Sequence, residues 1–475
     1  MKKAIRCIAF LIILFLTINI TYDVLSWKDT HGDYTTSTRQ LYSTEDNLID
    51  AVFLGSSHCY CSINPDLLWG TYGVSAFNMT ISGQDKDSTY HTLVETLKTQ
   101  SPKVVCVEMW GLTFDEHAAQ GNVYRNMLAM ELSKNSIELV KDYVDEEEQM
   151  DYILRWPIIH TRYKELEKYD FVTYEYSEYG RSVPLSYYTG MSGHYPADAL
   201  DEAASVEEPL SDSNKEWLDE LYQLSLEEDF ELIFFAAPSA TTAEAQMQMD
   251  AAKRYADEKG IVFFDFNRMI GSGDFSLDYS KDFIDTYHLN AWGAEKLTSF
   301  FGTYFERNIF LEDHRGDDAY HQWDDSYTHY EQVKAQYELE QIYTIEEYIE
   351  KLQSMHHITY IVSMEGDYDE STLDLENAMA MLGLSKEEYE QGGTYICVDG
   401  EMQKLWDKDS TEAAIYELNE YDTFKVQNMQ LIDPETTNLD NIMLNMESVG
   451  AVYNGISFAV YDDFRKQLMN KRGFF

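Results

Sequence analysis

The chain has 475 residues, of which 44% are hydrophobic and 14% aromatic, so it is long enough for two folded domains and too apolar to be disordered. Its 85 acidic residues outnumber the 35 basic ones, which gives a formal net charge of −50. A surface of this sign repels phosphate backbones, so it excludes nucleic-acid partners and docking on anionic lipid through a basic patch.

The first 27 residues have the composition of a membrane anchor. The basic start MKKAIR is followed by Cys7–Ile20, which is apolar apart from Thr17 and Asn19. No small-x-small cleavage pattern follows the apolar run, and no cysteine stands just after it. We therefore predict a retained signal-anchor rather than a cleaved signal peptide. The protein is then a single-pass protein of the cell membrane with the bulk of the chain extracytoplasmic.

Residues 28–310 alternate between short apolar runs and amphipathic segments. The spacing predicts strands at 47–54, 103–109, 231–237 and 261–266, and helices at 89–99, 243–259 and 294–307. Continuous apolar strands that alternate with helices are typical of an α/β fold with a parallel sheet covered on both faces. In such folds, ligands bind at the carboxyl ends of the strands.

A long insertion, roughly residues 115–215, separates the second and third predicted strands. A structureless loop of that length is improbable in a compact domain, so we predict a mostly helical cap over the active site. The insertion contains Leu154–His160 and the tyrosine-rich stretch Tyr169–Tyr195. Its aromatic side chains either pack the cap or stack on sugar rings.

The chain beyond Phe310 divides into two parts. Residues 311–345 are acidic and aromatic with little apolar patterning, which predicts a linker or helix. A small C-terminal α/β domain is predicted over 346–475, with strands at 357–364, 394–400 and 451–463 and a helix at 375–384.

Two short motifs carry the chemistry. Gly55-Ser-Ser-His58 ends the first predicted strand, and Asp285-Thr-Tyr-His288 lies far downstream. A serine is a weak nucleophile until a base removes its proton. The second motif supplies that base, with a carboxylate to orient the imidazole. We therefore predict one of the two serines, Ser56 or Ser57, as nucleophile, His288 as general base and Asp285 as the group that orients it.

These motifs resemble the conserved blocks of the SGNH/GDSL hydrolase superfamily across roughly residues 47–305. In its Gly-Asp-Ser block the third residue is the nucleophile, which corresponds to Ser57, with Ser56 in place of the aspartate. The stretch from Asn78 to Gly83 resembles the second block, whose glycine donates a backbone N–H to the oxyanion hole. The resemblance implies a flavodoxin-like parallel sheet sandwiched by helices.

One block departs from that pattern. Where the superfamily has Gly-x-Asn-Asp, this chain reads Val107-Glu-Met-Trp-Gly111, without an asparagine donor. Losing one such donor costs about 10²–10³ in rate. The backbone N–H groups of Ser57 and Gly83, or the Asn78 amide, are the predicted substitutes. The departure favours acyl transfer over hydrolysis and leaves both open.

The role of His58, next to the nucleophile, has two readings. It either contacts substrate or only shapes the turn. If the backbone stays extended after Ser57, the side chain of His58 points away from the nucleophile.

The chain looks most like membrane-anchored SGNH-like proteins of bacterial surface-glycan loci, akin to the D-alanyl transfer protein of teichoic acid synthesis and to alginate O-acetyltransferases. This resemblance implies an extracytoplasmic O-acyltransferase or esterase that modifies a surface polysaccharide through acyl-Ser57. Its partners are a glycan or glycopolymer and a membrane acyl-donor protein, and no metal or cofactor is expected. The alternative is a catalytically inactive SGNH-fold scaffold or glycan-binding partner.

The C-terminal domain weakly resembles the GG-type domain of interleukin-like EMT inducers. Tyr453-Asn-Gly455 stands where that family has an Arg-Gly pair. The resemblance implies carbohydrate or partner binding.

Overall fold

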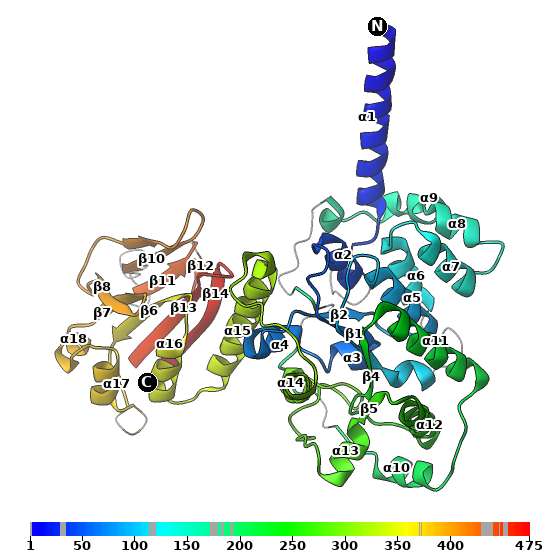
Figure 1. Ribbon diagram of the computed structural model, residues 1–475. Coiled ribbons are helices and arrows are strands. Elements are labelled where there is room, and N and C mark those ends of the chain that lie inside the picture. The colour runs from blue at the N-terminus through cyan, green and yellow to red at the C-terminus, as the bar shows by residue number, and fades with distance from the viewer. Residues whose placement is uncertain are drawn as a thin grey trace. The chain divides into compact units, whose positions relative to one another are not determined.

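The computed structural model divides the chain into two compact units, Met1–Tyr327 and Thr328–Phe475 (Figure 1). Each unit has its own core and is described separately. The structure describes residues 2–28, 35–113, 120–171, 179–181, 185–190, 193–369, 371, 373–428, 440–445, 447–449 and 455–475.

The first unit is built on a parallel five-stranded sheet of order β2-β1-β3-β4-β5. The strands are β1 (Ala51–Gly55), β2 (Ala76–Thr80), β3 (Val104–Glu108), β4 (Glu231–Ala236) and β5 (Val262–Asp265). The order is that of flavodoxin-like folds, which bind ligands where the strand order reverses, between β1 and β3. The predicted α/β class is confirmed. The sequence analysis missed β2, because its residues AFNMT carry an asparagine at the centre and show no alternation.

Helices cover both faces of this sheet, which is why its strands are apolar on both sides. One face, with Leu54 and Val107, packs against α2 (Thr36–Ser43), α5 (Lys86–Thr96), α11 (Asp212–Glu228) and α12 (Ala243–Lys259). The other, with Phe53 and Phe235, packs against α4 (Pro65–Tyr72), α13 (Phe266–Ser272) and α14 (Ala291–Asn308). Helix α12 has the predicted bounds and ends at Gly260, whose φ of 77° suits a residue without Cβ.

The middle of the chain is helical, as predicted. It comprises α6 (Gln120–Ala129), α7 (Lys134–Tyr143), α8 (Gln149–Leu154), α9 (Trp156–Ile159), the 3₁₀ turns η2 (His160–Lys164) and η3 (Lys168–Phe171), and α10 (Ala197–Ala204). Helices α6 and α7 share a small apolar cluster that includes Val123, Leu139 and Tyr143.

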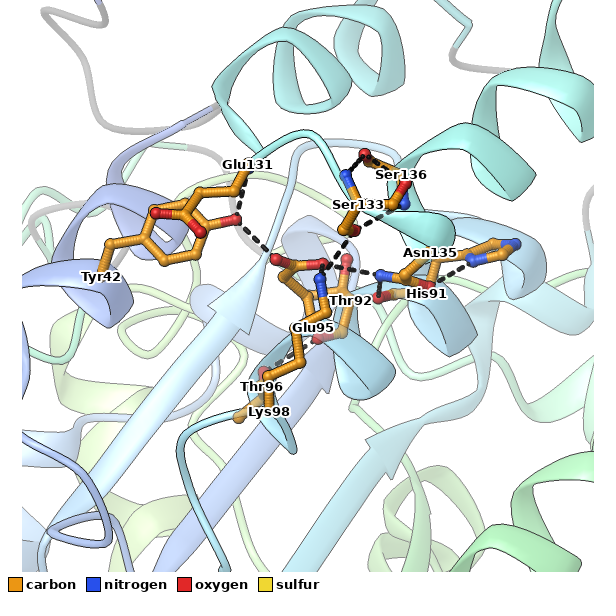
Figure 2. A network of polar contacts seen from close by, with 10 residues as sticks. All are labelled: Tyr42, His91, Thr92, Glu95, Thr96, Lys98, Glu131, Ser133, Asn135 and Ser136. Carbon is orange, nitrogen blue, oxygen red and sulfur yellow. Dashed lines mark hydrogen bonds and ion pairs between the residues drawn. The ribbon is translucent and has the colours of Figure 1, made fainter. Parts of the chain in front are cut away.

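A buried polar network fastens this helical region to the sheet layer (Figure 2). The Glu95 carboxylate of α5 accepts hydrogen bonds from the Tyr42 hydroxyl of α2 (2.7 Å) and from the Asn135 amide of α7 (2.8 Å). Asn135 also bonds the His91 ring at 2.7 Å. Because Glu95 is 2% exposed, its buried carboxyl group joins three helices through hydrogen bonds.

Helix α1 (Lys2–Leu25) projects from this unit, and Ile5–Leu25 is long and apolar enough to cross a membrane (Figure 1). By length and composition, it fits either a membrane anchor or a signal sequence. Its last turn is packed rather than free. The Arg162 guanidinium donates to the carbonyls of Leu25 (3.0 Å) and Ser26 (2.7 Å) and pairs with Asp170 at 2.9 Å.

The predicted linker begins as part of the first unit. Tyr320, in the 3₁₀ turn η4 (Asp318–Tyr320), and Trp323, at the start of α15 (His321–Gln341), are buried beside Trp69 of α4. The division between the units falls later in α15. Aromatic residues that had no apolar periodicity in sequence therefore belong to the core.

The second unit contains antiparallel sheets. One has the order β14-β13-β6-β7-β8 and packs against α16 (Ile345–Ser354) and α17 (Leu375–Met381), with α18 (Lys386–Gln391) beside them. Its strands are β6 (Ile358–Glu365), β7 (Gly393–Val398), β8 (Glu401–Trp406), β13 (Gly455–Asp462) and β14 (Gln467–Phe474). The other has the order β12-β11-β10-β9, from β9 (Ala414–Glu417), β10 (Thr423–Asn428), β11 (Asp440–Leu444) and β12 (Glu447–Ser448). Of the stretch Tyr453-Asn-Gly455, the first two residues lie outside the described part of the chain.

Candidate active site

The candidate nucleophile sits on a sharp turn at the carboxyl end of β1. Gly55 ends the strand with φ +144°, and a Cβ there would lie 2.7 Å from the Cβ of Glu108. Only glycine fits that close approach. Ser56 then caps α3 (Ser57–Tyr60) by accepting the His58 N–H, so the chain turns into a helix at Ser57.

The structure brings Ser57, His288 and Asp285 together although the first two are far apart in sequence. His288 Nε2 lies 2.8 Å from Ser57 Oγ, and His288 Nδ1 lies 2.9 Å from Asp285 Oδ2. Because the carboxylate only accepts, the imidazole donates from Nδ1 and leaves Nε2 as acceptor for the serine proton. This is the geometry of a serine, base and orienting acid.

The loop that carries His288 is held at both sides. The Asp285 side chain accepts the backbone N–H groups of Tyr287 (2.7 Å) and His288 (2.9 Å), which folds Asp-x-x-His into a tight turn. Thr286 O accepts the N–H of Ala240 at 3.0 Å, which ties the loop to the segment that follows β4. The two halves of the site therefore lie at the carboxyl edge of one sheet, near the ends of β1 and β4, with β3 between these strands.

The Asp285 carboxyl is ionised. Partial burial opposes this, but hydrogen bonds from His288 and from the Tyr287 N–H lower the pKa of Asp285 below its ordinary value. The side chain is 44% exposed and that of His288 is 24% exposed. The described residues therefore leave both side chains partly open, and a substrate can reach them.

A second carboxyl lies beneath the turn in a closed environment. Glu108, at the end of β3, is fully buried; its Oε2 accepts the Ser56 hydroxyl at 3.2 Å and its Oε1 the Trp110 N–H at 2.9 Å. Burial, opposed by these hydrogen bonds, raises the pKa of Glu108 to about 8. The Ser56 hydroxyl is thus hydrogen-bonded to Glu108, while the Ser57 hydroxyl faces His288.

His58 lies beside the His288 imidazole, not away from it. The backbone does not stay extended after Ser57, because α3 begins there, so the condition under which His58 would point away is not met. The His58 ring stacks on Trp110 at 4.2 Å between centroids, and its centroid lies 5.0 Å from that of His288. Burial, together with the neighbouring His288, lowers the pKa of His58 to about 3, so the ring is neutral at physiological pH.

The remaining predicted residues lie in and after β2. Gly83 has φ +69° in the loop that follows β2, and the Ile81 N–H of that loop bonds the Gly55 carbonyl at 3.4 Å. Asn78 stands in the middle of β2 and its amide donates to Ile63 O at 3.1 Å. In this arrangement Asn78 supports the chain after α3. The oxyanion roles of Gly83 and Asn78 stay predictions.

The thiols near the nucleophile are held in the neutral form. Burial raises the pKa of Cys61 to about 12 and that of Cys59 well above its ordinary value. Among the described residues, no group of three His, Cys, Asp or Glu side chains is placed to hold a metal ion.

The second half of the insertion reaches this site. Ser186 O accepts the Ala291 N–H at 2.7 Å, and the Thr189 hydroxyl donates to Lys281 O at 2.9 Å. These bonds support both sides of the Asp-x-x-His turn. The first half lies against α5 and the end of α1 instead, so the two halves of the predicted cap have different positions.

Sequence reasoning assigned His288 to Ser57 but gave Ser56 no partner. For Glu108 and Trp110 it left two readings, lining of the acceptor site or a buried structural role, and the structure buries Glu108. The available signal was a glutamate at the end of a buried strand, which is rarely left unpaired.

The chain was compared with protein-family models and with curated proteins, and it matches neither. Its function is therefore inferred from the geometry of the site.

Proposed function

We propose that this protein is an extracytoplasmic serine enzyme that transfers an O-acyl group, such as acetyl, to or from a cell-surface polysaccharide through acyl-Ser57. One observation carries the proposal. His288 lies within hydrogen-bond distance of both the Ser57 hydroxyl (2.8 Å) and the Asp285 carboxylate (2.9 Å). Chance packing of polar side chains rarely aligns a hydroxyl, an imidazole and an ionised acid in this order.

The reaction proceeds by double displacement. His288 Nε2 takes the Ser57 proton as Oγ attacks the acyl carbonyl carbon, and the tetrahedral intermediate carries the charge on oxygen. The Ser57 N–H, which opens α3 and has no helical acceptor, and the Gly83 N–H stabilise that oxygen. The protonated imidazole then gives its proton to the leaving oxygen. A sugar hydroxyl, or water, repeats the sequence in reverse on acyl-Ser57.

A carbohydrate acceptor is supported by exposed aromatic rings near the catalytic turn. Tyr287 precedes His288 and is 49% exposed, and Tyr188 of the insertion is 65% exposed. The neighbouring Tyr187 is buried against Trp292, with ring centroids 4.7 Å apart. The exposed rings are therefore free to stack on sugar faces, whereas Tyr187 packs the insertion.

A membrane location is supported by the N-terminal helix. Its last residue, Leu25, is buried, and the Arg162 side chain bonds the Leu25 and Ser26 carbonyls. Cleavage within this turn would expose the buried Arg162–Asp170 ion pair. We therefore propose that α1 is retained as the anchor, and that the acyl donor reaches Ser57 from a membrane protein.

Labelling with a fluorophosphonate tests the nucleophile. We expect the wild type and Ser56→Ala to react and Ser57→Ala to remain unlabelled, because only Ser57 faces His288. Equal labelling of the wild type and Ser57→Ala would remove Ser57 as nucleophile. No labelling of any form, with the protein folded, would favour the inactive scaffold.

The acceptor is tested separately with an acetylated glycan, with and without a polyol. Acetyl found on the polyol identifies transfer, and free acetate alone identifies hydrolysis. The Ser57→Ala variant is the control for both products.

A further inference from the structure

We infer that the face of the insertion around the exit of α1 lies on the membrane and contacts lipid through four exposed apolar side chains. The inference rests on the proposed retention of α1 as an anchor. It concerns Met150 and Leu154 of α8, Tyr163 of η2 and Phe171 of η3, here called the lipid-contact residues.

The length of α1 sets the depth of this face. The apolar span Ile5–Leu25 has 21 residues. At 1.5 Å per residue it is about 31 Å long, which matches the hydrocarbon thickness of a bilayer, roughly 30 Å. No apolar residue is left over as a spacer, so Leu25 lies at the membrane surface. Whatever packs against residues 22–27 lies there too.

The insertion packs directly against those residues. The ring of Tyr22 meets that of Trp156 at 6.0 Å, and the Arg162 guanidinium lies 5.4 Å from the Trp27 ring while bonding the Leu25 carbonyl. Figure 1 shows α8 and α9 beside the base of α1. Tryptophan and tyrosine are enriched at the boundary between hydrocarbon and water, and here they mark the same level.

The lipid-contact residues are large apolar side chains in the segment that holds the anchor. Their exposed fractions are 58%, 57%, 63% and 65% for Met150, Leu154, Tyr163 and Phe171. In water, such exposure is unfavourable, and each side chain gains when it enters the interface.

Charge favours the same occupant. The chain has a net charge of −50, yet residues 149–171 carry as many basic as acidic side chains. The basic ones are Arg155, Arg162, Lys164 and Lys168, and the acidic ones are Asp151, Glu165, Glu167 and Asp170. Because its charges balance, this stretch does not itself repel anionic head groups, although the exposed acidic residues 145–148 precede it.

Photo-crosslinking of the full-length protein in phosphatidylcholine nanodiscs tests the inference. The photoreactive residue p-benzoylphenylalanine replaces Leu154, Tyr163 or Phe171 in separate variants. It replaces Phe310 as a control in the same unit, because that side chain is 85% exposed and lies outside the insertion. Replacement of Ile12, inside α1, reports insertion of the anchor. Lipid adducts are measured by mass spectrometry of the peptides.

We expect lipid adducts at positions 154, 163 and 171 at several-fold the yield of position 310. Background yields at these positions, with strong adducts at position 12, would overturn the lipid contact and leave the anchor intact. Cross-linked dimers in place of lipid adducts would overturn it in favour of a second copy of this chain. Failure at position 12 as well would overturn the anchoring itself. The readout does not depend on catalysis, so the roles of Ser57 and His288 are unaffected by any result.

Discussion

Ser56 and Ser57 are neighbours in sequence and lie in opposite environments. The Ser57 hydroxyl faces an imidazole that solvent can reach, backed by Asp285. The Ser56 hydroxyl faces Glu108 in a closed layer under the turn. The difference arises because α3 begins between them, so that one side chain points into the open site and the other back toward β3.

The two acids differ in the same way. Hydrogen bonds outweigh partial burial and lower the pKa of Asp285, whereas full burial raises the pKa of Glu108 to about 8. An ionised acid can stabilise an imidazolium during turnover. A neutral acid can hold a hydroxyl and a backbone N–H in place without a charge. The open pair, Ser57 with Asp285 on either side of His288, is thus suited to chemistry. The closed pair, Ser56 with Glu108, is suited to positioning.

Asp285→Asn breaks the open pair and has the largest expected effect. An asparagine can donate to Nδ1 and so favours the wrong tautomer of His288. We expect acyl-ester turnover, measured with p-nitrophenyl acetate, to fall by about 10³–10⁴-fold with the fold intact. Asp274→Asn is the matched control, because Asp274 is exposed and, in the described contacts, its side chain bonds the nearby Ser272 only. Equal rates for the two variants would contradict the orienting role.

Glu108→Gln changes the closed pair and alters the pH dependence of stability. Below about pH 4.5 the carboxyl is protonated in both the folded and unfolded chains, and it imposes no penalty. As the pH rises toward about 8, only the unfolded chain ionises, so the free energy of unfolding of the wild type falls. Glutamine does not titrate and retains polar partners for Ser56 and Trp110.

We therefore expect the Glu108→Gln variant to gain stability relative to the wild type as the pH rises from 5 to 8. The gain is on the order of 3–5 kcal/mol at most. Denaturant unfolding of the detergent-solubilised protein at several pH values measures it. A difference between the two proteins that does not change with pH would show that Glu108 is ionised in the folded chain.

Gly55→Ala tests the close approach of the two strands under the serine turn. The added Cβ would meet Glu108 at 2.7 Å in a backbone conformation that favours glycine. We expect a loss of about 2–4 kcal/mol in the free energy of unfolding. Gly260→Ala is the control, because nothing lies within 4 Å of its added Cβ although its φ is also positive. If the two variants lose equal stability, the contact with Glu108 is not the cause.

His58→Phe has the smallest expected effect. Phenylalanine preserves the stack on Trp110 and removes the ring nitrogens that can meet a substrate beside His288. Loss of one hydrogen bond to substrate predicts a three- to tenfold decrease in kcat/KM, about 1 kcal/mol. An unchanged kcat/KM would assign His58 to packing alone.

The sequence predicted the parts of this fold that repeat a simple pattern. Strands β1, β3, β4 and β5 and helix α12 are apolar runs or amphipathic spacings with clear ends. The C-terminal unit was predicted as α/β from its helix and three strands, but its sheets are antiparallel and include further strands. Those strands, such as β8 with the residues EMQKLW, are partly exposed and polar, so no apolar run marks them.

For the candidate site, the sequence alone identified the chemistry of its residue types: a serine after a buried strand and an Asp-x-x-His motif. Nearby residues were enough to identify these two motifs, because they determine a short strand, a glycine turn and an Asx turn. The tertiary structure brings Ser57, the serine that the resemblance implies, to the imidazole. Only the tertiary structure decided that Glu108 is sealed beneath the turn and that His58 lies beside His288. Those relations depend on the register of β1 with β3 and on the loop held by β4, which bring together residues from distant parts of the chain.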